Sequence, residues 1–363
     1  MASKRFPYPS ELDSDDEGSI EYDWDDDSQP DDDDLDYRHH FQPRRAGDVP
    51  RAPSSPPRYH SVPSLHSNAA AFRKPPSGYI AVPVCVKHKP LCVVCKKQTV
   101  YKDYVTCGTT CIEKLYKDGP SDTTMCTYCH RRPKFSGKEQ CGRTCADKAK
   151  HACLLCKTRP KNKKYNFCGK TCKGIATKST PLILEIPKGH ITYDMVENKF
   201  KGGWKTGTPP AITKIFKVIE NDAFLKPYDA YRKRAGPKEN YLYHGTKRQC
   251  QLGVSTTQLC ASATCAICSI LKTSYKVEMA GQGSFGRGVY NSSASNKAFG
   301  YCGAGGAMLL NKVVLGKSVQ VSSGISSCPA GYDSVVYDPQ GASNETIVYS
   351  NDALRPVFLI MFQ

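Results

Sequence analysis

Twelve of the 19 cysteines in this 363-residue chain fall into three copies of one spacing. In each copy a Cys-x2-Cys pair is followed by eleven residues and then by a Cys-Gly-x-Thr-Cys pair. A close pair places two thiolates on one knuckle, and two knuckles complete a tetrahedral set of four sulfur ligands suited to Zn2+. The spacing therefore predicts three zinc sites. Their ligands, in chain order, are Cys92, Cys95, Cys107 and Cys111; Cys126, Cys129, Cys141 and Cys145; and Cys153, Cys156, Cys168 and Cys172.

Disulfide bonds and iron–sulfur clusters are the two alternatives for these cysteines. A disulfide scaffold requires an oxidising compartment, but the chain begins Met-Ala-Ser-Lys-Arg-Phe-Pro, without an apolar signal segment. A run of about 18 apolar residues, as a membrane-spanning helix requires, does not occur either. The sequence therefore favours zinc, and it predicts a nuclear or cytoplasmic protein that is not secreted and has no membrane partner.

Seven further cysteines lie outside the three repeats. Four of them are irregularly spaced, and for these the sequence leaves a fourth zinc site and ordinary packing equally open. They are Cys250, Cys260, Cys265 and Cys268. The other three are expected to behave as small apolar residues. They are Cys85, Cys302 and Cys328.

A second set of residues suited to chemistry lies in three motifs near the C-terminus. These are Tyr-Leu-Tyr-His-Gly-Thr at 241–246, Phe-Gly-Arg-Gly-Val-Tyr at 285–290 and Asn-Glu-Thr-Ile-Val-Tyr at 344–349. Each functional residue alone would have an ordinary structural explanation, but the three motifs in this order resemble the catalytic domain of poly(ADP-ribose) polymerases. That family carries a His-Tyr-Glu triad that binds NAD and transfers its ADP-ribose. The triad maps onto His244, Tyr290 and Glu345.

The resemblance runs from about residue 193 to the C-terminus and includes Phe-Lys-Gly-Gly-Trp at 200–204. The cysteines that follow the first motif are most similar to those of fungal and plant-type members. The family implies an α+β fold, a split mixed β-sheet with the NAD cleft between its halves. Strand-like runs at 307–315, 334–337, 346–349 and 356–362 agree with this fold.

The resemblance also implies a role for each site residue. His244 would hydrogen-bond the adenosine ribose. The backbone of Gly245 would clasp the nicotinamide carboxamide, because a residue without a side chain lets the ligand approach closely. Tyr290 and Tyr301 would sandwich the nicotinamide ring. Cleavage of the nicotinamide–ribose bond develops positive charge on the sugar, which the carboxylate of Glu345 would stabilise.

Three further positions bear on the expected contacts. Thr246 and Lys297 are predicted to bind the cofactor as well. At 298 the family usually has a serine whose hydroxyl bonds the carboxamide. Ala298 has no hydroxyl, so we expect one contact fewer, worth about 1 kcal/mol.

The segment Gly-Gln-Gly-Ser-Phe-Gly at 281–286 also fits the G-x-G-x-x-G pattern of dinucleotide-binding folds. Such folds need an acidic residue about 20 positions further on, but no Asp or Glu occurs between Glu278 and Asp333. We therefore reject a Rossmann fold, and expect a flexible turn that leads into the strand of Tyr290.

Charge divides the chain into regions. Residues 1–36 hold 15 acids against two bases, a net of −13, whereas residues 85–180 hold 22 Lys or Arg against six Asp or Glu, a net of +16. The basic region is suited to nucleic acid phosphates, although small zinc modules also use lysines merely for solubility and bind proteins as readily. The acidic leader and the Pro/Ser/Arg-rich stretch behind it lack hydrophobic periodicity and are predicted to be disordered.

These observations predict three parts: a disordered tail (1–80), three four-cysteine zinc modules (81–178) and an ADP-ribosyltransferase domain (179–363). The predicted enzyme transfers ADP-ribose, as monomer or polymer, from NAD+ to acceptor proteins that include the chain itself. The alternative is a catalytically weak adaptor that binds nucleic acid or protein. Between residues 172 and 200 there is no room for the helical regulatory domain of the DNA-dependent polymerases, so activation through that domain is not expected.

Overall fold

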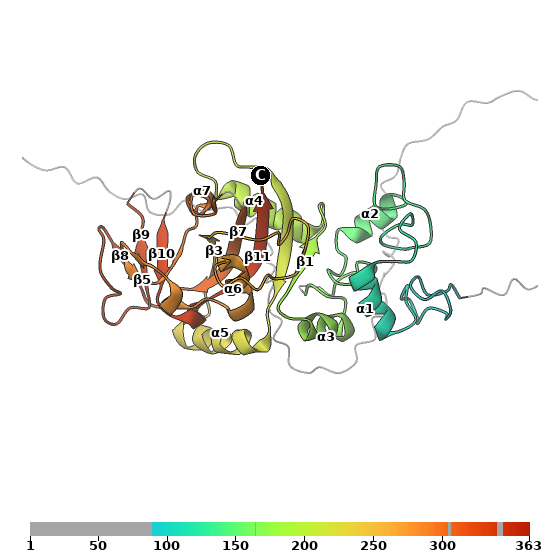
Figure 1. The fold of residues 1–363 in the computed structure, drawn as a ribbon, viewed down its shortest axis with the longest axis horizontal. Helices are drawn as coiled ribbons and strands as arrows, with labels where there is room; N and C mark the ends of the chain where they lie inside the picture. Colours follow the sequence, from blue (N-terminus) through green and yellow to red (C-terminus); the bar gives the residue numbers. More distant parts are fainter. Residues whose placement is uncertain (1–88, 164, 304–305, 340–343) are drawn as a thin grey trace, which may run out of the picture. The chain divides into compact units, whose positions relative to one another are not determined.

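The computed structural model describes residues 89–163, 165–303, 306–339 and 344–363 (Figure 1). The predicted tail and Cys85 lie outside the described residues. Within the described ranges, every helix is too short or too polar to span a membrane.

The three cysteine repeats adopt the same backbone fold. In each repeat, the N–H of the first cysteine donates to the carbonyl six residues later at 2.8 Å, which closes the first knuckle. A helix then begins directly after the glycine of the second pair and carries the last cysteine in its first turn. These helices are α1 (Thr109–Asp118), α2 (Arg143–Ala149) and α3 (Lys170–Lys178).

A five-stranded antiparallel sheet forms the centre of the C-terminal domain, in the order β1-β2-β11-β7-β3. Its strands are β1 (Leu182–Ile186), β2 (Ile212–Ile219), β3 (Glu239–Gly245), β7 (Ala307–Val314) and β11 (Leu354–Phe362). Every residue of β7 and β11 is buried, because helices cover both faces of the sheet. Helices α4 (Ile191–Gly202) and α7 (Ser295–Phe299) lie on one face, and α5 (Asp222–Ala235) and α6 (Ala266–Thr273) lie on the other (Figure 1).

A second, four-stranded sheet has the order β6-β10-β9-β8. Its strands are β6 (Val289–Asn291), β8 (Ser318–Val321), β9 (Ser334–Tyr337) and β10 (Glu345–Val348). Only the β8–β9 pair of this sheet is parallel. A bridge between Tyr243 and Ser292 joins β3 to the end of β6, and the 3-10 turns η1 (Val277–Met279) and η3 (Asn351–Ala353) complete the domain. The α+β class and the split mixed sheet are therefore confirmed.

The glycine-rich segment is more ordered than its composition suggests. Strands β4 (Gln282–Gly283) and β5 (Gly286–Arg287) pair as a short hairpin, and no helix begins there, unlike in a dinucleotide-binding turn. The expected turn therefore leads into the strand of Tyr290, and it takes the form of a paired hairpin. Gly286 takes φ +82°, in the left-handed region that favours glycine.

The third cysteine module shares its apolar core with the five-stranded sheet. Phe167 and Ile175 of this module belong to the same buried cluster as Ile186 and Ile215 of the sheet. Two hydrogen bonds connect the module to the domain: the His190 ring Nε2 donates to the Ala152 carbonyl oxygen at 3.0 Å, and the Ile191 backbone N–H donates to the Lys150 carbonyl at 3.0 Å. Residues on both sides of position 178 thus pack as one body.

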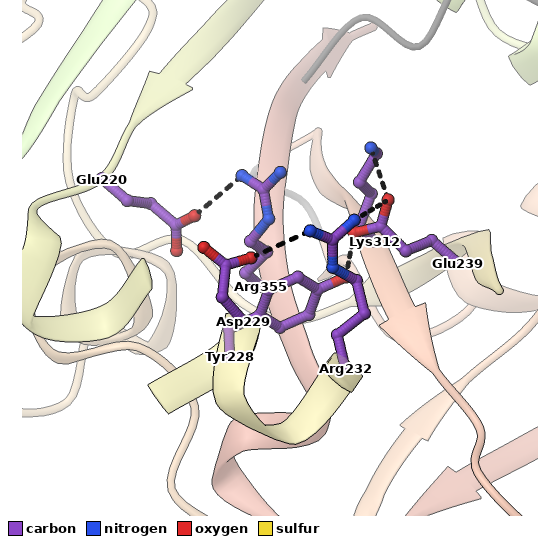
Figure 2. Close-up of polar contacts among 7 residues, drawn as sticks. All are labelled: Glu220, Tyr228, Asp229, Arg232, Glu239, Lys312 and Arg355. Carbon is purple, nitrogen blue, oxygen red and sulfur yellow. Dashed lines mark hydrogen bonds and ion pairs between the residues drawn. The ribbon is translucent and has the colours of Figure 1, made fainter. Parts of the chain in front are cut away.

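A buried charged network attaches α5 to the sheet (Figure 2). The Tyr228 hydroxyl donates to one carboxylate oxygen of Glu239 at 2.5 Å, and the Lys312 ammonium lies 2.7 Å from the other. On β11, Arg355 pairs with Glu220 at 3.3 Å and lies over the Tyr228 ring. Glu239 is the first residue of β3 and His244 is its last but one, so the network holds the opposite end of that strand, roughly 17 Å from His244.

Candidate active site and metal centres

His244 lies one residue before the end of β3, where its ring is held from two sides. Nδ1 is 2.8 Å from the carbonyl oxygen of Tyr290, so Nδ1 carries the proton and donates it. The ring of Tyr275 packs edge-on at 5.2 Å. Burial lowers the pKa of His244, which keeps the imidazole neutral near pH 7. Nε2 is then an acceptor, as the expected bond from a ribose hydroxyl requires.

The packing of Gly245 gives a steric reason for glycine at this position, beside the ligand contact that the resemblance implies. A Cβ at this position would lie 1.8 Å from the carbonyl oxygen of Ala298 and 3.1 Å from the Cβ of Tyr301. Any side chain would therefore push β3 away from α7 before a ligand is bound. The close contact also places Tyr301, which follows α7, beside Gly245.

The two tyrosines expected to hold nicotinamide are positioned differently. The hydroxyl of Tyr290 accepts from the Phe285 N–H at 2.9 Å and donates to the Gly286 carbonyl at 2.8 Å, so the β4–β5 hairpin fixes its ring. Burial raises the pKa of Tyr290, and the nearby Glu345 and Tyr301 add to the effect. Tyr301 is 63% exposed, which leaves its ring available to a ligand.

Glu345 is the first residue of β10 and forms an ion pair with Lys297 of α7. The Lys297 Nζ and Glu345 Oε1 atoms are 2.8 Å apart, and each side chain is about one quarter exposed. The preceding residue, Asn344, accepts from the Ser292 hydroxyl at 2.6 Å through its carbonyl and from the Ser293 N–H at 2.8 Å through its side chain. These bonds tie the start of β10 to the segment after β6, and so set the position of the carboxylate.

The structure brings most of the predicted site residues together. His244 contacts Tyr290, Gly245 contacts the α7 segment, and Lys297 contacts Glu345. Thr246 directly follows Gly245, and its backbone N–H lies near the Cys302 thiol, whose pKa burial raises to about 12.

Sequence reasoning did not find the two residues that support the triad. Asn344 lies within the third motif, so a polar residue directly before the glutamate was the available signal. Tyr275 donates to Asn311, which in turn bonds Asn291, and this buried chain fixes the ring that packs on His244. As one of 21 tyrosines, Tyr275 carried no sequence signal.

The family model of the poly(ADP-ribose) polymerase catalytic domain matches residues 191–361. This segment is therefore a member of that domain family, whose activity is ADP-ribosyl transfer from NAD+. No curated protein matches the chain.

The three predicted four-cysteine sets each gather at one point, and so do the four irregularly spaced cysteines. Within each set the sulfur atoms all lie within 4.8 Å of one another. Each described cysteine is a free thiol, so no described pair forms a disulfide.

The sulfur separations fit a tetrahedral zinc centre. Contacts within the three repeats measure 3.6–3.8 Å. Four sulfurs at about 2.3 Å from one zinc ion lie roughly 3.8 Å apart, whereas a disulfide is about 2.05 Å long. The geometry is thus compatible with zinc in each repeat.

The fourth set has the same geometry although its sequence spacing is irregular. Cys250 follows β3, Cys265 directly precedes α6, and Cys268 lies within that helix. Their sulfurs are 3.6 Å (Cys250–Cys268) and 3.7 Å (Cys250–Cys265) apart, with Cys260 in the same group. Of the two alternatives for these cysteines, a fourth zinc site and ordinary packing, the geometry favours a metal site.

Proposed function

We propose that residues 179–363 transfer ADP-ribose from NAD+ to protein acceptors, including this chain itself, with release of nicotinamide. The observation that carries the proposal is that the three triad residues lie on neighbouring strands. His244 donates to the backbone of Tyr290 on β6, and Glu345 opens the neighbouring strand β10 beside them. Ligand-binding and charge-stabilising groups thus meet at the junction of the two sheets.

The chain's groups divide the work of binding. The neutral imidazole of His244 accepts a hydroxyl of the adenosine ribose through Nε2. The fixed ring of Tyr290 and the exposed ring of Tyr301 hold the two faces of nicotinamide. The Gly245 backbone holds its carboxamide. Together they leave one face of the second ribose open to an acceptor.

In the transfer step, the bond between the ribose C1 carbon and the nicotinamide nitrogen breaks and its electron pair stays on nicotinamide, which leaves neutral. An acceptor nucleophile forms the new bond to the same carbon and loses its proton. Positive charge on the sugar is largest between these events, and the carboxylate of Glu345 opposes it. Lys297 holds Oε1 of that carboxylate and thereby sets the direction of Oε2.

The test is automodification with labelled NAD+, measured together with nicotinamide release. Glu345→Gln keeps the size of the side chain but removes its charge, so transfer should fall by about two to three orders of magnitude. NAD+ carries its positive charge on the nicotinamide ring before the reaction, so affinity should change far less than rate. His244→Ala should show the opposite balance.

Glu197→Gln is the matched control, because Glu197 on α4 is 24% exposed and pairs with Lys201 as Glu345 pairs with Lys297. It should leave transfer unchanged. If Glu345→Gln transfers ADP-ribose near the unmodified rate, the assignment of the triad is wrong. If the unmodified chain neither modifies proteins nor releases nicotinamide, the adaptor alternative replaces the enzyme.

The same assay reads the length of the product, since a polymer gives a ladder on a denaturing gel and a monomer a single shift. We propose that the protein acts in the nucleus or cytoplasm. The free thiols of the described cysteines support a reducing compartment. Microscopy of the tagged full chain tests this location.

Binding of nucleic acid by the cysteine modules is the proposed second function. Residues 89–178 hold 21 Lys or Arg against six Asp or Glu, a net of +15. Such a surface neutralises phosphates and releases counterions, so affinity should fall steeply with salt. Binding that is absent at low salt, or indifferent to salt, would assign the modules to protein contacts.

A further inference from the structure

Each of the three cysteine modules has a loop with the same backbone conformation at the equivalent position. Six residues after the Cys-x2-Cys pair stand Tyr101, Phe135 and Asn162. In each case the N–H of this residue donates to the carbonyl five residues on, and its carbonyl accepts from the N–H three residues on, at 2.8–3.0 Å. The loop backbone is therefore the same, and the modules differ in the side chain at its tip.

In the first two modules this tip is a large exposed aromatic ring. Tyr101 is 56% exposed and Phe135 is 65% exposed. A single exposed apolar residue needs no explanation, but two aromatic rings at the same place in a repeated fold are a shared feature. Phe135 has no polar atom that solvent would satisfy, so its exposure costs free energy unless a ligand covers it.

One lysine is adjacent in sequence to each ring. The Lys102 Nζ atom lies 5.5 Å from the centroid of the Tyr101 ring. Lys134 directly precedes Phe135 and pairs with Glu139 at 2.8 Å, and residues 89–178 together have a net charge of +15. Flat apolar faces within a cationic surface complement a ligand with flat bases and phosphates.

Contacts between the first and third modules hold the loop that carries Tyr101. Asp103 and Tyr104 lie in the Tyr101 loop, and both contact Arg159 of the third module. The Arg159 guanidinium is 3.0 Å from the Asp103 carboxylate and 4.0 Å from the centroid of the Tyr104 ring. The loop that presents Tyr101 is thus braced against the module that packs on the catalytic sheet, so Tyr101 need not be ordered when a ligand binds.

We infer that Tyr101 and Phe135 are stacking platforms for the bases of single-stranded nucleic acid, with neighbouring lysines binding its phosphates. This inference rests on the proposed nucleic-acid function and makes it specific. In a duplex the bases stack on one another and are closed to the rings, so a single strand is the fitting partner. The third module presents Asn162 at the tip and does not stack.

The test uses the full zinc-loaded chain and a fluorescein-labelled single-stranded 12-mer, with anisotropy measured from 50 to 300 mM salt. The double variant Tyr101→Ala/Phe135→Ala should bind about 30-fold or more weakly, since each stacked base contributes at least about fivefold to affinity. The slope of affinity against salt should stay the same, because no charge is removed. Binding of the corresponding duplex should change less than threefold.

Two further variants control for folding and for exposed tyrosines in general. Tyr101→Trp/Phe135→Trp keeps flat rings and should retain binding, with tryptophan fluorescence quenched by the strand. Tyr332→Ala removes a partly exposed tyrosine that lies under Lys317 in the catalytic domain, and it should leave binding unchanged.

Three outcomes would overturn the inference. If the alanine double variant binds the single strand within threefold of the unmodified chain, or loses single strand and duplex equally, the rings do not stack, although the nucleic-acid function stands. If the unmodified chain binds only poly(ADP-ribose) or an acidic protein, the nucleic-acid function fails as well.

Discussion

Replacing Ile175 with alanine is expected to destabilise the catalytic domain, although Ile175 belongs to the third cysteine module. Ile175 is 5% exposed and lies in the same buried cluster as Ile186, Ile215 and Phe200 of the catalytic domain. Truncating a buried isoleucine to alanine costs about 2–5 kcal/mol. In a domain of this size each kcal/mol lowers the melting temperature by roughly 2–4 °C, so a loss of about 4–20 °C should result.

The matched control is Leu115→Ala in the first module. Leu115 is 8% exposed and, like Ile175, stands about one helical turn after the last cysteine ligand of its module. It packs with Val93 and Val105 in a separate cluster that contains no residue of the catalytic domain. This substitution should loosen the first module and leave the catalytic domain unaffected.

The measurement is hydrogen exchange of the β1 and β2 peptides across a thermal ramp, followed by residual ADP-ribosyl transfer. Ile175→Ala should lower the temperature at which both strands exchange and the temperature at which activity is lost. Leu115→Ala should change neither temperature. If Ile175→Ala releases zinc from its own module but leaves the exchange of β1 and β2 unchanged, the third module does not share its stability with the sheet.

Three further predictions concern metal, pH and substrate affinity. Elemental analysis should find four zinc ions per chain and three after Cys141→Ser; fewer than two, or iron, would contradict the sulfur geometry. Burial lowers the pKa of His190 to about 4 in the folded chain. As the pH falls, this histidine therefore takes up a proton in the unfolded chain before it does so in the folded chain. Stability present above about pH 6.5 should therefore be lost towards pH 4, by up to about 3 kcal/mol. His190→Gln does not titrate, and equal pH slopes in urea unfolding of the two proteins would refute this origin. Ala298→Ser restores the missing hydroxyl and should tighten NAD+ binding about fivefold; calorimetry showing no gain would mean that the hydroxyl does not reach the carboxamide.

Spacing explains what the sequence could predict. The family of the C-terminal domain followed from three short motifs in a fixed order, and the family match and the α+β fold confirm it. The four sulfur atoms of each repeat come together because each knuckle is a local structure. One backbone hydrogen bond closes it, between the first cysteine and the residue six positions later. Strands β7 and β11 were recognisable because each contains a run of apolar residues, Ala307–Leu310 and Val357–Phe362. The roles of the individual site residues stay predictions.

The remaining features depend on contacts that spacing does not encode. The need for glycine at 245 comes from a carbonyl at Ala298, and the partner of Glu345 is Lys297 on a different element. The fourth cysteine set assembles across a strand end, a loop and a helix, so its separations follow no pattern. The β4–β5 hairpin has two-residue strands, too short to show any alternation.

The shared core of the third module also determines where the chain can be cut. A fragment that begins at 179 would expose the apolar side of β1 and lose the two backbone partners of His190 and Ile191, which lie at Ala152 and Lys150. We therefore expect that an isolated fragment with the activity proposed for residues 179–363 must start near residue 150, so that it retains the third cysteine module. The first module reaches the same core through Ile112 and pairs with Arg159 of the third module through Asp103, so a cut between these two modules also removes contacts that stabilise the enzyme's side of the chain.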